Sequence, residues 1–174
     1  FVKDPFLNEI GTVHYNQGDT LDYLYKTLND TKKSVAYLKE KADLYKSSIS
    51  YPQNELAENL SGIAQLINAG AETKVYYASI SGFDTHINQV VQQNKLLEKV
   101  SESLASFIED LRKGGQLDST MVLVFSEFGR RVKENGSKGT DHGTANNVMI
   151  LGGKLKKSGF LNAGPDLLNL DDDD

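Results

Sequence analysis

The 174-residue chain contains no cysteine and no tryptophan, and it has only three prolines and three histidines. The absence of cysteine excludes disulfides and thiolate metal sites, and it leaves the redox compartment undecided. No apolar run is long enough to cross a bilayer, so we expect no transmembrane segment. The net charge of −5 argues against a nucleic-acid-binding protein, which would usually present a basic face. Hydrophobic residues at 39% and charged residues at 25% are typical of a folded domain and not of a disordered chain.

The two ends of the chain carry few signals of a complete protein. The first residues do not resemble a signal peptide, there is no starting methionine, and residues 171–174 are four consecutive aspartates. We therefore expect residues 1–174 to form a single domain that is the C-terminal part of a longer chain. Within it we predict a mostly helical lead-in over 1–70, a β-α-β-loop-β core over 71–153, and a loop-like tail over 154–174.

The lead-in begins with an irregular stretch over residues 1–18. Either Asp19 or Thr20 is suited to be the N-cap of a helix. Apolar residues at helical spacing then predict one long amphipathic helix over 21–45, with a candidate break at 29–31. A second helix should run from about Asn54 to a glycine at its C-terminal end, Gly70.

The predicted core alternates strand and helix. Residues 74–80 are rich in β-branched and aromatic side chains and predict a strand. A third helix over 87–112, ended by Gly114-Gly115, should lead to a continuous apolar strand over 120–125 that is buried on both faces. A last strand is expected at 148–151. This order predicts a right-handed β-α-β unit and an α/β fold whose sheet is mostly parallel.

Polar residues with metal-binding chemistry follow the ends of the predicted strands. Asp84 and His86 come just after the first strand and Glu127 just after the second, so both loops should lie at one rim of the sheet. His142 precedes the third strand, and it can reach the same rim directly only if that strand runs antiparallel to the others. Imidazole beside carboxylate is a ligand set that suits a divalent metal. The sequence therefore predicts one metal or anion site at this rim.

Simpler explanations exist for the same residues. Asp84 could cap the following helix, and Asp141-His142 could be a polar turn with a buried histidine. Glu127 could pair with Arg130, and Arg131 could lie in a solvated loop. The third histidine, His14, is far from the other candidate ligands in sequence, and we expect a structural role for it.

Three motifs together resemble the DUF1501 family of bacterial proteins. They are the segments 82–89, 126–130 and 139–144, which occur in the family's order and are separated by a helix of suitable length. Phe83 stands where the family usually has tryptophan, and Arg131 departs from the family pattern. The resemblance covers roughly residues 70–170 and implies an exported, periplasmic protein.

The family is in turn similar to the alkaline phosphatase and sulfatase superfamily. That similarity implies an alkaline-phosphatase-like three-layer α/β sandwich, here incomplete, with an antiparallel strand at the edge of a mostly parallel sheet. It implicates Asp84, His86 and His142 as ligands of one metal. The superfamily's second Asp-His pair is replaced here by Glu127-Phe128, and its nucleophilic serine or threonine would lie upstream of this chain.

These observations lead to one functional hypothesis and one alternative. The hypothesis is a metal-dependent hydrolase-like protein that acts on a small anionic substrate, a phosphate or sulfate ester. Zn²⁺ or Mn²⁺ would be held by Asp84, His86, Asp141 and His142, with Glu127 and Arg130 as catalytic residues, and Arg130 would clamp the anion. The alternative is an exported, non-catalytic binding or assembly protein that retains the fold. The sequence does not specify the oligomeric state.

Overall fold

The computed structural model describes residues 20–170, so residues 1–18, Asp19, and the acidic end at 171–174 lie outside the described part. Within these described residues, three α-helices are followed by a 3-10 turn and four short strands. These elements are α2 (Thr20–Leu44), α3 (Glu55–Asn68), α4 (Gln89–Lys113), η2 (Leu117–Ser119), β1 (Val122–Val124), β2 (Gly129–Arg130), β3 (His142–Gly143) and β4 (Met149–Leu151).

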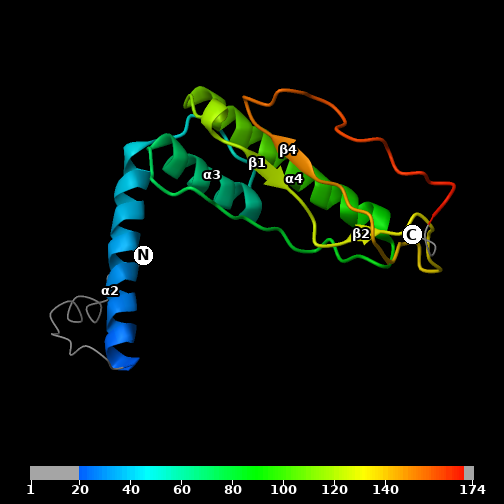
Figure 1. Ribbon diagram of the computed structural model, residues 1–174, viewed down its shortest axis with the longest axis horizontal. Coiled ribbons are helices and arrows are strands. Elements are labelled where there is room, and N and C mark those ends of the chain that lie inside the picture. The colour runs from blue at the N-terminus through cyan, green and yellow to red at the C-terminus, as the bar shows by residue number, and fades with distance from the viewer. Residues whose placement is uncertain (1–19, 171–174) are drawn as a thin grey trace.

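The helix α2 is continuous and has none of its residues buried. It projects away from the rest of the molecule (Figure 1). The predicted break at 29–31 is wrong. Thr31 and Ser34 donate their hydroxyl hydrogen bonds to carbonyls four residues earlier, at 2.7 and 2.9 Å. Back-bonding of this kind satisfies the hydroxyl inside the helix at a small cost to helix stability, and here it does not end the helix.

The hydrophobic core lies between α3 and α4. It is made by buried side chains of both helices, namely Leu56, Leu60, Ala64, Phe107 and Leu111. Asn54 caps α3 by accepting a hydrogen bond from Ala57 N, and Gly70 follows the helix with φ of +69°. Both features were predicted, because local capping chemistry fixes the ends of this helix.

The helix α4 matches the predicted third helix closely, and Gly114 is its C-cap. Its apolar stripe is only partly covered. Phe107 and Leu111 in the C-terminal half are buried, whereas Val90 and Leu97 in the N-terminal half are 67% and 53% exposed. The core therefore lies at one end of α4, and the polar loops described below lie at the other.

The predicted three-layer sandwich with a mostly parallel sheet is not what the structure contains. In the described part of the chain there are only two sheets, each of two short antiparallel strands, beside the three helices. Residues 71–86 form no strand. Ala78 and Ile80 pack against the core, but Val75 and Tyr77 are 83% and 77% exposed. β-propensity measures how well a segment fits a pleated surface, and this segment has no hydrogen-bonded neighbour to form one.

The predicted last strand is nevertheless oriented as expected. β1 pairs with β4 antiparallel, with Val122 opposite Leu151 and Val124 opposite Met149. Burial of β1 on both faces is a wrong prediction, since Leu123 is 52% exposed. The antiparallel return matters for the site because it brings the segment before β4 back beside the loop that precedes α4.

None of the helices described is both long and apolar enough to serve as a membrane span, in agreement with the sequence prediction.

Candidate metal centre

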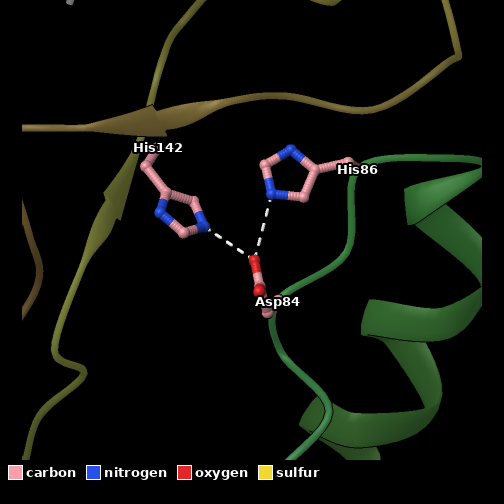
Figure 2. A group of neighbouring side chains, drawn as sticks. All are labelled: Asp84, His86 and His142. Carbon is pink, nitrogen blue, oxygen red and sulfur yellow. Dashed lines mark hydrogen bonds and ion pairs between the residues drawn. The ribbon is translucent and has the colours of Figure 1, made fainter.

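Asp84, His86 and His142 converge on one point in the loops at the open end of α4. His86 Nε2 lies 3.0 Å and His142 Nε2 lies 2.7 Å from the same carboxylate oxygen, Asp84 Oδ1 (Figure 2). One potential ligand atom from each residue lies within 4.8 Å of the others. The two histidines are 56 residues apart in sequence, so the predicted meeting of the two loops is confirmed.

The donor set fits a divalent cation of the first transition row. Metal–ligand bonds of about 2.0–2.2 Å place neighbouring ligand atoms about 3.0–3.5 Å apart. The two measured separations from Asp84 Oδ1, 3.0 and 2.7 Å, are at or slightly below that range. Small side-chain adjustments would therefore open the site for an ion. Two imidazoles and one carboxylate leave further coordination positions open, and the side chains are 42–66% exposed.

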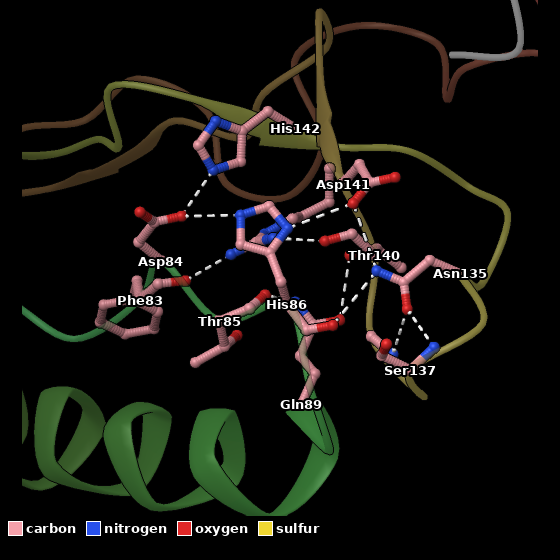
Figure 3. Close-up of polar contacts among 12 residues, drawn as sticks. Phe83, Asp84, Thr85, His86, Gln89, Asn135, Ser137, Thr140, Asp141 and His142 are labelled. Atoms are coloured by element: carbon pink, nitrogen blue, oxygen red, sulfur yellow. Dashed lines mark hydrogen bonds and ion pairs between the residues drawn. The ribbon is translucent and has the colours of Figure 1, made fainter.

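Asp141 orients His86 and stands apart from the three converging atoms. Its Oδ1 atom lies 3.2 Å from His86 Nδ1, the ring nitrogen on the other side from Asp84 (Figure 3). Asn135 donates to the same carboxylate oxygen at 3.2 Å and to the His86 carbonyl at 3.1 Å. A carboxylate on the remote nitrogen of a ligating histidine fixes the orientation of the ring and raises its basicity. The predicted ligand role of Asp141 thus becomes a supporting one.

Two carboxylates of the site have lowered pKa values. The hydrogen bond from His142 holds the pKa of Asp84 below its ordinary value, and the bond with His86 acts in the same direction. The hydrogen bond from Asn135 lowers the pKa of Asp141, and His86 again adds to this effect. Ionised carboxylates beside imidazoles attract a cation.

Arg130 is bound to the backbone of the loops around the site. Its Nη1 and Nη2 atoms each donate to a backbone carbonyl at 2.5 Å, those of Thr140 and Phe83 respectively. These carbonyls belong to the two loops that carry the candidate ligands. The structure therefore places Arg130 as a tie between loops, although the sequence suggested an anion clamp.

Phe128 stacks against His142. The two ring centroids are 3.9 Å apart with an interplanar angle of 12°, and Arg130 Cζ lies 5.0 Å from the Phe128 centroid. A ring at this position cannot bind a metal, but it can hold the imidazole in one plane.

Close backbone packing joins the loop at 135–139 to the start of α4. The amides of Asn88 and Gln89 donate to the carbonyls of Ser137 and Lys138, both at 3.0 Å. A Cβ added to the buried Gly139 would lie 2.3 Å from the His86 carbonyl oxygen, so only glycine allows this approach.

Glu127, the remaining predicted site residue, takes no part in the cluster. Glu127 is exposed, and in the part of the chain that the structure describes it makes no ion pair with Arg130. Asp84 does not cap α4, because Asn88 holds the N-cap position. Asp141-His142 is not a buried polar turn, since both residues are exposed.

Two supporting residues were missed by the sequence analysis. Asn135 holds the loop by accepting from the amides of Ser137 and Gly139 at 2.9 and 3.2 Å while it also contacts Asp141. Asn-Gly at 135–136 is a local signal for a turn, but the contact of Asn135 with a remote loop carries no local signal. The Thr140 hydroxyl, which donates to Gln89 Oε1 at 2.9 Å, likewise depends on the tertiary fold.

Comparisons with known proteins extend the description of the chain. No curated protein and no solved structure matches it. One family profile, described as "Protein of unknown function (DUF1501)", matches residues 51–167. That span includes α3, α4, the four strands and every residue of the candidate metal centre. The chain therefore belongs to the DUF1501 family.

Proposed function

We propose that the protein binds a divalent metal ion through Asp84, His86 and His142 and uses it to hydrolyse phosphate or sulfate esters. The observation that carries the proposal is the convergence of these three side chains on one point from two remote loops. Nitrogen and oxygen donors together favour Zn²⁺ or Mn²⁺ over Ca²⁺, which prefers oxygen ligands alone. When bound, the cation would act as a Lewis acid on a phosphoryl or sulfuryl oxygen.

The charge of the site supports a metal-dependent reaction. Asp84 and Asp141 would repel an anionic ester, and Arg130 is engaged with backbone carbonyls. Attraction of the substrate would therefore come from the cation. We expect hydrolysis to require the metal completely. We also propose that the protein is related to the alkaline phosphatase and sulfatase superfamily. The choice of phosphate and sulfate esters as substrates rests on that relation.

A non-catalytic metal-binding or assembly protein is the second candidate. It is favoured by the surroundings of the site, in which no serine or threonine hydroxyl of the described residues contacts the three candidate ligands. Thr85, the nearest hydroxyl in sequence, is buried and accepts from Gln93 Nε2 at 3.2 Å. The two candidates share the metal and differ in whether chemistry follows binding. An exported location is proposed for both.

Hydrolysis of aryl esters separates the two. The purified chain would be loaded with Zn²⁺ or Mn²⁺ and assayed on an aryl phosphate and an aryl sulfate, with the Asp84→Asn variant as the control for contaminating enzymes. The hydrolase proposal predicts turnover that disappears on chelation and in the variant. Metal binding without turnover of either ester would favour the second candidate.

A further inference from the structure

Arg130 joins the two loops that supply the candidate ligands. Phe83, whose carbonyl accepts from Nη2, immediately precedes Asp84. Thr140, whose carbonyl accepts from Nη1, lies two residues before His142. Because the guanidinium is planar and rigid, two hydrogen bonds from it fix the carbonyls relative to each other. One side chain thus sets the spacing of loops that meet only through tertiary structure.

The same guanidinium lies over the ring that orients His142. Phe128 is stacked on the imidazole at 3.9 Å, and Arg130 Cζ is 5.0 Å from the Phe128 centroid. A cation over an aromatic face is attracted to it, so Arg130 holds Phe128 as well as the loops. The orientation of the Phe128 ring limits rotation of the imidazole, and that rotation decides whether His142 Nε2 points at Asp84.

The strand pairing places these groups in register. Arg130 and His142 are opposite each other in the β2–β3 ladder, and Gly129 is opposite Gly143. A Cβ on Gly143 would lie 2.6 Å from the Arg130 carbonyl carbon, so the two strands approach very closely. The distance between the Arg130 and His142 backbones is therefore fixed by the ladder.

We propose that Arg130 and Phe128 are positioning residues that hold Asp84, His86 and His142 in a metal-ready arrangement before an ion binds. This inference rests on the proposed metal site and deepens it, since it assigns to Arg130 a role in cation affinity in place of anion binding. Charge alone is insufficient for that role: lysine has a point charge and lacks the planar fork needed for two carbonyls.

The first test measures Zn²⁺ affinity by competition with a chelator in the full chain. Arg130→Lys should weaken affinity by roughly 10- to 100-fold, the usual effect of disturbing groups that support metal ligands. Arg112→Lys is the matched control, because Arg112 pairs with Glu109 on α4 away from the site, and it should retain parental affinity. Phe128→Leu should also weaken affinity, whereas Phe128→Tyr, which keeps the ring, should restore it.

The second test needs no metal. In the metal-free chain, the ring protons of His142 should resonate upfield of their ordinary range because of the stacked Phe128 ring. Arg130→Lys should move them back toward that range, and Arg112→Lys should leave them in place. An unchanged His142 signal in Arg130→Lys, or parental Zn²⁺ affinity in that variant and in Phe128→Leu, would overturn the inference. If Arg130→Lys does not fold, as judged by circular dichroism, the Zn²⁺ affinities of Phe128→Leu and Phe128→Tyr test the inference instead.

These outcomes are separable from failure of the proposed function. A parental chain that binds no Zn²⁺ or hydrolyses no ester defeats the proposed function, while the His142 signal still decides whether Arg130 and Phe128 control the imidazole.

Discussion

At the scale of single residues, His86 has a different partner on each ring nitrogen. Nε2 faces Asp84 at the point where the candidate ligands converge, and Nδ1 faces Asp141. This arrangement separates the group that would hold an ion from the group that orients the ring. The carboxylate of Asp141 is held in turn by Asn135, so the orientation is built into the loop.

The Asp141→Asn variant tests that division of roles. Removing the charge beside His86 Nδ1 should lower Zn²⁺ affinity by about 10-fold or more, because supporting carboxylates raise the basicity of ligating histidines. Titration calorimetry provides the measurement. Asp166→Asn is the matched control, since Asp166 also accepts from an asparagine amide but has no histidine beside it. Equal loss in both variants would contradict the orienting role.

A fully buried carboxylate, that of Asp110, lies away from the site and belongs to the core. Asp110 is fully buried and accepts hydrogen bonds from the phenols of Tyr45 at 2.8 Å and Tyr51 at 3.0 Å. Burial, and then the hydrogen bonds to Asp110, raise the pKa of both tyrosines above its ordinary value. These phenols therefore stay protonated in the folded chain at pH values where the unfolded chain ionises them.

Tyr51→Phe should destabilise the protein by about 1–3 kcal/mol, because the Asp110 carboxylate loses one of its two hydrogen-bond donors.

The pH dependence of stability follows from the raised pKa of Tyr51. A raised pKa in the folded state contributes stability that is complete below pH ~10 and declines as the pH rises above it. Urea unfolding on both sides of pH ~10 should show a smaller alkaline loss in the variant than in the parent. Tyr23→Phe, at a 69% exposed position, should match the parent, and a parental alkaline loss in Tyr51→Phe would refute the assignment.

At the scale of elements, the loop at 135–139 is held against the start of α4 by hydrogen bonds from the amides of Asn88 and Gln89. Gly139→Ala would put a Cβ 2.3 Å from the His86 carbonyl oxygen and should push the two loops apart. We expect a loss of Zn²⁺ affinity of about 10-fold or more, of the size seen when supporting groups around metal ligands are disturbed. Gly136→Ala is a control in the same loop, because nothing lies within 4 Å of its added Cβ. If both alanine variants bind Zn²⁺ equally, the close approach does not matter for the site.

The helices and the paired strands β1 and β4 could be predicted from the sequence, whereas the expected mostly parallel sheet is wrong. The ends of α3 and α4 follow from local chemistry at Asn54, Gly70 and Gly114, and the periodic apolar residues identify their buried faces. A strand depends on a partner that lies far away in sequence. Residues 74–80 have the composition of a strand but pair with nothing in the described part of the chain, so composition alone was misleading.

The convergence of the three candidate ligands could be predicted from the sequence, whereas the residues that support them could not. Asp84, His86 and His142 could be identified because imidazole and carboxylate recur in short motifs, and the antiparallel return of β4 brings them together. The roles of Arg130 and Phe128 depend on contacts across the loops. Arginine near a polar motif suggests an anion clamp, and only the two carbonyl contacts reveal a tie between loops.

At the scale of the whole molecule, packing and chemistry occupy different ends of α4. The core is concentrated where α3 covers the C-terminal half of α4 (Figure 1), and the loops that carry the candidate ligands lie around the N-terminus of α4. Loops carried on a rigid scaffold are a common location for binding residues. The site can therefore be altered by substitution without removing the α3–α4 core, which makes metal affinity a clean readout of its geometry.

The most direct measurement is a calorimetric titration of Zn²⁺ and of Mn²⁺ into the metal-free chain, beside the His142→Gln and Asp84→Asn variants. Asp43→Asn, which alters an exposed pair with Lys46 on a different surface, is the control. We expect one ion per chain for the parent and the control, and affinity lower by more than about 100-fold in both ligand variants, beyond the usual effect of supporting groups. Parental affinity in His142→Gln and Asp84→Asn, or no binding of either ion by the parent, would contradict it.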